Sequence, residues 1–375
     1  MNRMKGDRMM EEQMIKSVLV SYEALKAFCE EAFHRFGFEP AQSERITDVL
    51  LAADLYGIDS HGTNRIVLYH EQIRSGFIDV AAQPEVVFAT PVSAVIDGNR
   101  GMGQLVSVRA MEEALRLARA SGVGLVTVRN SNHHGIAGYY SRLAAQEGFL
   151  GIAMTNSLKA VVPTFARVPV LGTNPMAVTY PGNPVPFHFD ASTSVVTAGK
   201  FEVYHKQGHP IPAGWGINAA GEEETDPGAV LEAMKTGQGG IHPLGGGGEI
   251  HGGHKGYGFA MLAEIFSSIL SQGITSNHVE EGDTAGVCHF FAAIDPALFG
   301  DAAAISDHLE RFLTELREAP KAQGQERIYI HGEKEAECYD RRKAEGIRIN
   351  PAVLREMRDM AQDLNMVLED YFPAI

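Results

Sequence analysis

The sequence predicts an α/β fold in which helices cover a sheet, and two observations support this class. From residue 123 onward, short apolar segments typical of buried strands alternate with segments whose apolar residues recur at helical spacing. Helical patterns also occupy both ends of the chain. With 375 residues, of which 45% are hydrophobic and 21% charged, the chain can bury a large core and has the composition of an ordinary globular protein.

The N-terminal part is expected to consist of helices with recognisable ends. Ser21 is a suitable N-cap for an amphipathic helix over residues 22–36, which Gly37 ends, and a second helix is expected over 43–56. Asp59 and Ser60 can cap a third helix over 65–75, closed by a glycine.

The next elements follow from changes in apolar periodicity. Residues 85–96 indicate two short strands separated by a Thr-Pro break, and apolar positions from residue 104 return to helical spacing until Gly122. The remaining elements, in order, are a strand over 123–128, a helix over 135–145, strands over 150–154, 176–180 and 185–189, helices over 197–207 and 257–271, a strand over 289–294, and helical segments over 302–317 and 351–368.

Glycine spacing argues against an ordinary Rossmann domain. No Gly-x-Gly-x-x-Gly follows a predicted strand, and the nearest glycine cluster, residues 98–103, has a different spacing. The glycine-dense stretch over 237–258 follows a polar segment, so by itself it fits a surface loop as well as a binding loop.

Charge and cysteine content restrict partners and location. The net charge of -15 argues against nucleic acid and against anionic membranes as partners. Three widely spaced cysteines indicate reduced thiols and a cytoplasmic protein, and no apolar run approaches the roughly 18 to 20 residues that span a bilayer. Residues 1–16 lack the apolar core of a secretory signal and are expected to be a loose leader.

Three short stretches combine titratable or hydrogen-bonding side chains with small residues: 59–65, 130–135 and 187–194. If a helix begins at the cap near residue 60, His61 and Arg65 share a face. A proton donor beside a carboxylate-binding guanidinium suits a 2-oxo acid. The alternative, a helix start with a solvated histidine and arginine, stays open on these residues alone.

Six motifs occur in the order found in one known family: Asp-Ser-His-Gly followed by Arg65, Asn-Ser-Asn-His at 130–133, Gly-Thr-Asn-Pro at 172–175, Pro-x-Gly-Trp at 212–215, Thr-Asp-Pro at 225–227, and Gly-His-Lys-Gly-Tyr-Gly at 253–258. From about residue 22 to the C-terminus the sequence thereby resembles the malate/L-lactate dehydrogenase family, which also holds sulfolactate and ureidoglycolate dehydrogenases and diketogulonate reductase. The resemblance implies a mixed-sheet α/β fold that binds NAD or NADP without the Rossmann fingerprint. It also implies a homodimer with sites near the subunit interface.

The resemblance further implies roles for individual residues. His61 would donate a proton to the keto oxygen, Ser60 would take part in a relay with Asp190, and Arg65 would bind the substrate carboxylate. His133 matches a second histidine, which is assigned as the proton acceptor in the ureidoglycolate enzyme, so the main proton transfer stays open between the two histidines.

The residues implied in cofactor binding lie in four segments. They are Ser157; His188, Asp190, Ala191 and Ser192; Lys255 and Gly256; and Glu333 with Lys334. Lys255 is also favoured by chemistry, because a glycine-flanked turn before a helix offers backbone N–H groups and an ammonium to a phosphate. The alternative is an ordinary surface lysine. The expected division assigns 131–257 to cofactor binding, and 20–130 with 258–375 to a helical substrate part.

The predicted activity is therefore the interconversion of an (S)-2-hydroxy acid and its 2-oxo acid, with malate as the first candidate. The segment 162–167 departs from the family pattern near the substrate end, so lactate, sulfolactate, ureidoglycolate and diketogulonate stay as alternatives. Two other classes are less consistent with the sequence: a metal-dependent hydrolase, suggested by 15 histidines although no His-Glu-x-x-His occurs, and a non-catalytic nucleotide-binding protein. We expect no metal site.

Overall fold

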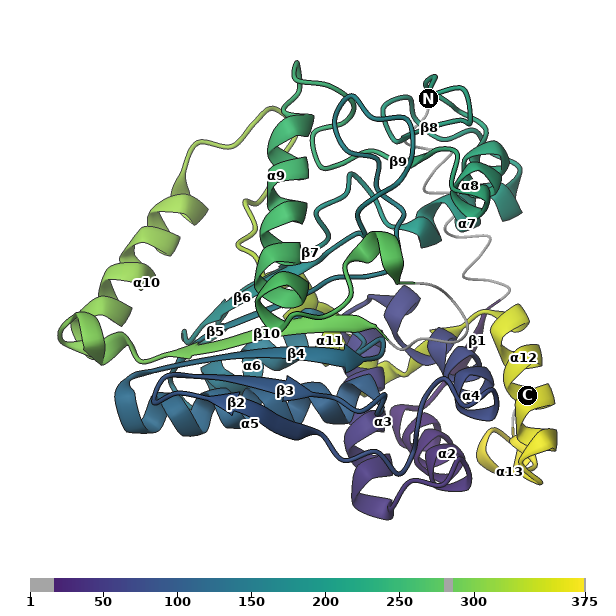
Figure 1. Cartoon of the computed structure of the whole chain (residues 1–375), viewed down its shortest axis with the longest axis horizontal. Coiled ribbons are helices and arrows are strands. Elements are labelled where there is room, and N and C mark those ends of the chain that lie inside the picture. The colour runs from purple at the N-terminus through teal and green to yellow at the C-terminus, as the bar shows by residue number, and fades with distance from the viewer. Residues whose placement is uncertain (1–16, 280–285, 374–375) are drawn as a thin grey trace. The chain divides into compact units, whose positions relative to one another are not determined.

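The computed structural model describes residues 17–279 and 286–373, so the expected leader over 1–16 lies outside the described residues. The chain forms two compact units, the first from Met1–Ala81 with Glu333–Ile375 and the second from Ala82–Gly332 (Figure 1). These boundaries differ from the expected division. Strand β10 (Val287–Ile294) lies between β4 (Val123–Ser131) and β5 (Leu150–Thr155) in one sheet, so the chain beyond residue 258 completes the same sheet.

The first unit is mainly helical and brings the two ends of the described chain together. Its helices are α2 (Tyr22–Arg35), α3 (Pro40–Leu55), α4 (Ile66–Arg74), α11 (Glu333–Glu345), α12 (Pro351–Asp363) and α13 (Leu368–Tyr371). Strand β1 (Val18–Val20) pairs antiparallel with β11 (Ile347–Ile349). The Ser21 hydroxyl accepts from Ala24 N, which confirms the predicted cap of α2. Helix α3 begins earlier than predicted, because Pro40 occupies its first turn.

The second unit is built on a mixed sheet of seven strands in the order β2-β3-β4-β10-β5-β6-β7. The further strands are β2 (Glu85–Ala89), β3 (Ser93–Asp97), β6 (Met176–Tyr180) and β7 (Phe187–Ala191). Only the β3–β4 pairing is parallel within this sheet, so the predicted mixed α/β fold is confirmed.

Helices cover both faces of this sheet (Figure 1). Side chains alternate along β10: Phe290 packs on Ala263 of α9 (Gly253–Glu264), whereas the Phe291 ring lies 5.5 Å from that of Tyr140 in α6 (Ala137–Gln146). Helix α5 (Gly103–Ser121) ends at left-handed Gly122, as predicted.

The remaining elements include three that the sequence did not predict, α8 (Pro227–Thr236), β8 (Gly216–Ile217) and β9 (Gly240–Ile241). They pack around a small core with helix α7 (Ala198–Gln207), which confirms the helix predicted over 197–207. The predicted helix over 257–271 divides into α9 and a π-helical turn (Ile265–Ile269), and α10 (Ala302–Glu318) follows β10. Within the described residues, no helix has both the length and the apolar character needed to cross a bilayer.

Candidate active site

The segment that carries Ser60, His61 and Arg65 is not α-helical. Two 3-10 turns, Asp59–His61 and Thr63–Arg65, precede α4, and Gly62 separates them with φ −90° and ψ −141°. The predicted cap is therefore wrong, because Arg65 itself occupies the N-cap position of α4 without a side-chain cap. The shared helical face of His61 and Arg65 is wrong for the same reason.

Side-chain hydrogen bonds hold this segment in place of helical periodicity. The Ser60 hydroxyl lies 3.0 Å from His61 Nδ1, and Arg65 Nε donates to the Ser60 carbonyl at 2.7 Å. Buried Asp54 accepts from the Thr63 backbone N at 2.8 Å and from its hydroxyl.

Only glycine fits at the centre of the segment. A Cβ on Gly62 would lie 2.0 Å from Asp54 Oδ1, far inside any contact distance. Arg342 of α11 pairs with the Asp59 carboxylate and donates to the Asp54 carbonyl at 2.5 Å. The end of α3 and helix α11 together therefore determine where His61 and Arg65 lie within the first unit.

Burial shifts the pKa values of two groups in this segment, His61 and Asp54, in opposite directions. Burial, together with the nearby Arg65 charge, lowers the pKa of His61 to about 4. Burial raises the pKa of Asp54 to about 7, although the hydrogen bonds from Thr63 oppose that shift. His61 is therefore a neutral imidazole at pH 7 and can accept a proton.

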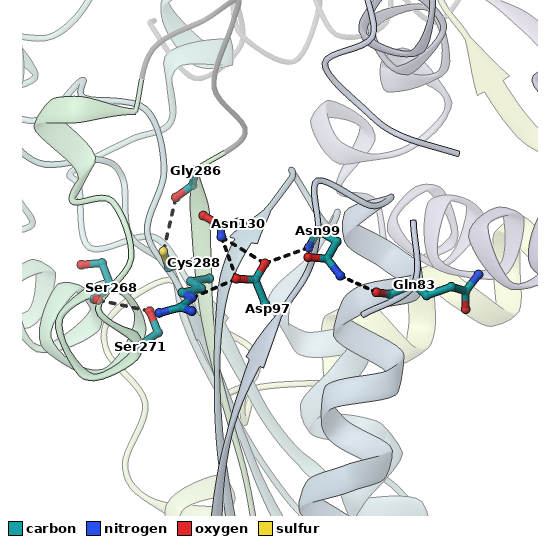
Figure 2. A network of polar contacts seen from close by, with 9 residues as sticks. Gln83, Asp97, Asn99, Asn130, Ser268, Ser271, Gly286 and Cys288 are labelled. Atoms are coloured by element: carbon teal, nitrogen blue, oxygen red, sulfur yellow. Dashed lines mark hydrogen bonds and ion pairs between the residues drawn. The ribbon is translucent and has the colours of Figure 1, made fainter. Parts of the chain in front are cut away.

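His133 lies beyond β4 in the second unit, and the end of β3 determines its position. Asp97 accepts from Asn130 Nδ2 at 2.9 and 3.0 Å and from Arg129 Nε at 3.0 Å, and Figure 2 shows this carboxylate between Asn130 and Asn99. These hydrogen bonds hold the pKa of Asp97 below its usual value against the effect of burial.

The backbone beside His133 adopts uncommon conformations. Asn130 has a φ of 53°, in the left-handed region that non-glycine residues rarely occupy. Two residues further, buried Asn132 donates to the carbonyls of Arg100 and Gly101 at 2.9 Å. His133 follows directly, so the chain on its N-terminal side is held by the end of β3 and by the loop at residues 100 and 101.

His188 and Asp190 lie on the same side of β7. A Cβ on Gly138, at the start of α6, would lie 2.7 Å from His188 Nε2 and 2.8 Å from Asp190 Oδ2. Gly138 N donates to Asp190 Oδ2 at 2.7 Å. The Thr179 hydroxyl lies 2.8 Å from His188 Nδ1, and burial, with a smaller effect of Arg142, lowers the pKa of His188 to about 4.

The segment after β7 is joined to Ser157 through the Gly-Thr-Asn-Pro motif. Thr173 N donates to the Ser157 hydroxyl at 3.0 Å, and Ser157 N donates to Asn174 Oδ1 at 3.1 Å. Thr193 N donates to the Thr173 carbonyl at 2.9 Å. Ser157 and the stretch from Asp190 to Ser192 therefore belong to one hydrogen-bonded region, which assigns a structural role to this motif.

The glycine-rich stretch extends the same region to the start of α9. Leu244 N donates to the Thr193 carbonyl at 2.8 Å, and a Cβ on Gly256 would lie 2.2 Å from the Leu244 carbonyl oxygen. Gly252, with a φ of 86°, precedes α9 in the N-cap position. Exposed Lys255 lies in the first turn. The stretch is packed backbone to backbone at Gly256 and is not an unattached loop.

The candidate residues thus divide between the two units. Ser60, His61 and Arg65 lie in the first, together with Glu333 and Lys334 at the start of α11, whereas His133, Ser157, His188, Asp190, Ala191, Ser192, Lys255 and Gly256 lie in the second. Among the described residues no group of three or more His, Cys, Asp or Glu side chains is arranged to hold a metal ion.

Sequence reasoning missed residues that support the site without belonging to it, Asp54, Asp97 and Arg342. Asp54 gave the clearest signal in the sequence, because it is an acidic residue between the apolar residues Ala53 and Leu55. All three are buried in helix α3. Arg342 gave none, because its partner Asp59 is 283 residues away in the sequence.

Comparison with known proteins identifies the family. The sequence model of the family described as malate/L-lactate dehydrogenase matches residues 20–358. A malate dehydrogenase of Pyrococcus abyssi is 40% identical over 347 residues, covering 92% of this chain and 94% of that protein, and an L-sulfolactate dehydrogenase of Methanocaldococcus jannaschii is 33% identical over 91% and 96%. The crystal structure of malate dehydrogenase from Entamoeba histolytica matches with a TM-score of 0.90 at 36% identity, over 93% of this chain and 99% of that one. The chain belongs to the malate/L-lactate dehydrogenase family.

Proposed function

We propose that this protein is an NAD(P)-dependent dehydrogenase that interconverts an (S)-2-hydroxy acid and its 2-oxo acid, with malate as the first candidate. The observation that carries the proposal is the hydrogen-bonded pair Ser60–His61 beside Arg65, on a segment that Asp54 and Arg342 hold, in a chain of this family. The Pyrococcus relative named malate dehydrogenase supports malate, and the named sulfolactate dehydrogenase keeps other 2-hydroxy acids as alternatives.

His61 has the properties of the proton-transfer group. Ser60 Oγ contacts Nδ1, so we assign proton exchange with the substrate oxygen to Nε2. With a pKa of about 4, His61 is neutral at pH 7 and can take the hydroxyl proton when the 2-hydroxy acid is oxidised. In the reverse direction it returns that proton to the keto oxygen.

Arg65 fits the substrate carboxylate by charge and shape. Its guanidinium presents a planar pair of donors that matches a carboxylate in two parallel hydrogen bonds. A bound carboxylate would also offset the Arg65 charge that depresses the pKa of His61. Substrate binding would therefore raise the pKa of His61 and ease its protonation.

His133 is the second candidate for proton transfer. It follows the Asp97-supported turn in the second unit, which carries the proposed cofactor residues. His188 suits a binding role better, because it is buried beside Gly138 and Asp190. Comparing His61→Ala with His133→Ala under identical conditions assigns the role to the variant that loses kcat while retaining cofactor affinity.

The second unit offers donors that fit a nicotinamide dinucleotide. The start of α9 combines a left-handed glycine, close backbone packing at Gly256 and the Lys255 ammonium, which together suit a pyrophosphate. The half-buried Ser157 hydroxyl and the Asp190–Ser192 segment belong to the same region. We also propose, from the family resemblance, that Glu333 and Lys334 bind the cofactor. When bound, the nicotinamide would accept or deliver the hydride at the carbon that bears the oxygen.

We further propose a homodimer. The side of α9 and its π turn that faces away from the sheet exposes Phe259 (47%), Leu262 (42%), Ile265 (40%) and Ile269 (53%) at helical spacing. An apolar stripe of this kind on a soluble enzyme is typical of a subunit interface, and a second copy supplies a self-complementary partner. Light scattering should give twice the chain mass of 40.6 kDa, and Ile269→Glu should shift it toward the monomer.

A cytoplasmic location is proposed from the cysteines. Cys29 and Cys288 are buried and Cys338 is half-buried, and each is a free thiol. Such thiols persist in a reducing compartment.

One experiment tests the activity directly. Protein purified without a histidine tag is assayed with oxaloacetate, pyruvate, 3-sulfopyruvate and 2,3-diketogulonate, each with NADH and with NADPH, by the nicotinamide absorbance. We expect oxidation of the reduced cofactor, fastest with oxaloacetate, and unchanged rates after chelation of metal ions. Absence of turnover with every 2-oxo acid would contradict the proposal.

A further inference from the structure

Glu264, the last residue of α9, is a buried carboxylate to which no catalytic or binding role has been assigned. It is 4% exposed, and its hydrogen-bond donors within the described chain are all neutral. They are Asn156 Nδ2 at 3.3 Å, Asn174 Nδ2 at 2.8 Å, the Ser268 hydroxyl at 2.8 Å, and the backbone N and hydroxyl of Ser276 at 2.8 and 2.6 Å.

Burying a carboxylate in a protein core costs free energy, because the group loses its hydration. An ionised group without a cationic partner must recover its lost hydration from hydrogen bonds alone, and an apolar side chain of similar size would stabilise the same position as well. Glu264 meets this requirement with five donors from four residues. The network joins segments that lie far apart in the sequence, around residues 156, 174 and 276, to the end of α9.

One branch of the network leads directly to the proposed cofactor site. Asn174 donates to Glu264 through Nδ2 and accepts from Ser157 N through Oδ1, at 2.8 and 3.1 Å. Asn174 has a φ of 35°, and a Cβ on Gly172 would lie 2.3 Å from the Ser157 hydroxyl. Asn174 thus has an uncommon backbone conformation, and the loops at Gly172 and Ser157 are closely packed against each other.

The backbone next to Glu264 is also unusual. The helix changes to a π turn at Ile265, and within that turn the Ser268 hydroxyl donates back to the Glu264 carbonyl and carboxylate. Ser268 in turn accepts from the Ser271 hydroxyl, a contact that Figure 2 shows. Single π turns inside helices are associated with functional sites, because they redirect side chains that a regular helix would place elsewhere.

We propose that Glu264 is a positioning residue for the cofactor site: its carboxylate holds the Asn156 and Asn174 side chains and thereby sets the position of Ser157. The same helix α9 begins at Gly253 with the proposed phosphate-binding turn and ends at Glu264. Helix α9 therefore connects the proposed phosphate-binding turn at its start with the network around Ser157 at its end. The inference rests on the proposed cofactor role of Ser157.

The test is the variant Glu264→Gln, which keeps the shape but turns an acceptor oxygen into an amide facing donors. The dissociation constants of NADH and NADPH are measured by cofactor fluorescence on the whole protein. We expect a rise of about tenfold, the loss typical of one disrupted charged hydrogen bond. At saturating cofactor, the KM for the 2-oxo acid should stay within about twofold of the wild type.

Glu113→Gln is the matched control. Glu113 is also 4% exposed and lies in the second unit, but it pairs with Arg116 in α5. Its substitution should lower the unfolding temperature without changing cofactor affinity. A purely structural role for Glu264 predicts the same behaviour for Glu264→Gln, and that result would overturn the proposal.

Asn174→Gly provides a second route in case Glu264→Gln does not fold. Glycine adopts the φ of 35° without strain, so this change removes the link between Glu264 and Ser157 while preserving the backbone. We expect the same loss of cofactor affinity as in Glu264→Gln. Unchanged affinity would overturn the proposal.

Ser157→Ala separates this proposal from the one on which it rests. If Glu264 acts through Ser157, the double variant Glu264→Gln/Ser157→Ala should bind cofactor no more weakly than Ser157→Ala alone. Additive losses would overturn the positioning role while retaining both residues in cofactor binding. An affinity unchanged by Ser157→Ala would remove Ser157 from the site and the positioning role with it.

Discussion

His61 and Arg65 lie near each other because of hydrogen bonds rather than helical spacing. The Ser60 side chain contacts the imidazole, and the Ser60 carbonyl binds the guanidinium, so one residue orients both candidate groups. Asp54 and Arg342 hold the backbone of this segment through Thr63 and Asp59. A function that needs an imidazole and a guanidinium at a fixed separation is therefore sensitive to residues that never contact the substrate.

Arg65→Lys should strongly raise the KM for the 2-oxo acid, because an ammonium cannot replace the planar pair of donors. Cofactor affinity should stay unchanged, since Arg65 is assigned to the substrate carboxylate and is not one of the proposed cofactor residues. Steady-state kinetics at saturating NADH measure the effect. Arg74→Lys is the control, because Arg74 lies at the far end of α4, the helix that Arg65 precedes, in an exposed pair with Asp363. A KM equal to that of the wild type would exclude Arg65 from the substrate site.

The pH dependence of 2-hydroxy acid oxidation should report the pKa of His61. As the proton acceptor, His61 must be neutral, so kcat/KM should rise with pH through about 4 and then level off. The variant Arg65→Gln removes the nearby cation, so the pH at which kcat/KM rises should increase toward the ordinary histidine pKa of 6.5. The Arg65 charge is the second of the two causes of the lowered pKa, after burial. Arg74→Gln should leave the pH of this rise unchanged. A rise that does not respond to Arg65→Gln would contradict the assignment.

Helix α9 shows how one element combines several requirements. Its glycine-rich start packs against the backbone of residue 244, its apolar side packs on the sheet through Ala263, and Glu264 at its end binds the loops at Asn156 and Asn174. Its opposite side exposes the apolar stripe assigned to the dimer. Small residues dominate where the helix meets the backbone, because no side chain fits there.

Gly256→Ala and Gly258→Ala form a matched pair on this helix. A Cβ on Gly256 would overlap the backbone of Leu244, at 2.2 Å from its carbonyl oxygen and 2.5 Å from its nitrogen, whereas a Cβ on Gly258 meets nothing within 4 Å. Gly256→Ala should therefore destabilise the fold by roughly 1–3 kcal/mol and weaken cofactor binding. Gly258→Ala should add up to about 1 kcal/mol of stability through helix propensity. Urea unfolding and cofactor titration check both variants, and equal behaviour of the two would contradict the packing argument.

The molecule as a whole carries buried histidines that acid should disrupt. His289 is completely buried, with Ser131 and Thr155 hydroxyls at 2.9 and 2.8 Å from its ring nitrogens, and its ring stacks on that of His134 at 4.2 Å. Burial lowers the pKa of His289 to about 3 and contributes most of the lowering of the His188 pKa to about 4. The effect of Asp54 on folding stability has the opposite dependence on pH, because its pKa is raised to about 7 in the folded state.

Folding stability should fall as pH drops from 6.5 toward 4. The unfolded chain binds protons at histidine below about pH 6.5, where folded His289 and His188 stay neutral, so each adds stability that is complete above 6.5 and is lost toward its folded pKa. His61, whose pKa is also lowered to about 4, adds a third contribution of the same sign, and Asp54 offsets one of the three between about pH 3.8 and 7. His289 alone should account for about 2 kcal/mol between pH 7 and 5, at about 1.4 kcal/mol per unit below 6.5.

Urea unfolding at pH 7 and pH 5 measures this loss. The difference should shrink by about 2 kcal/mol in His289→Asn. His308→Asn, at an exposed position in α10, is the control and should behave as the wild type. A pH dependence that is the same with and without His289 would contradict its assignment as a buried neutral group.

The sequence by itself determined the fold class, the family and most helices and strands. Helix caps such as Ser21, glycine stops such as Gly122 and the apolar runs of β4, β5 and β10 depend on residues close together in the chain, so local periodicity and turn chemistry reveal them. The candidate site residues were named in the same way, through short motifs, and their catalytic and binding roles stay predictions.

Only the tertiary structure decided how those motifs are supported. The backbone from Asp59 to Arg65 is set by Asp54 and Arg342, and the loops at Ser157 and Asn174 are set by Glu264, through hydrogen bonds between residues as many as 288 positions apart. The order of the sheet likewise depends on distant residues, because β10 pairs with β4 and β5, which lie more than 130 positions earlier in the sequence. Local sequence patterns carry no information on such pairings, because the free energy of each contact exists only after folding has brought its two partners together.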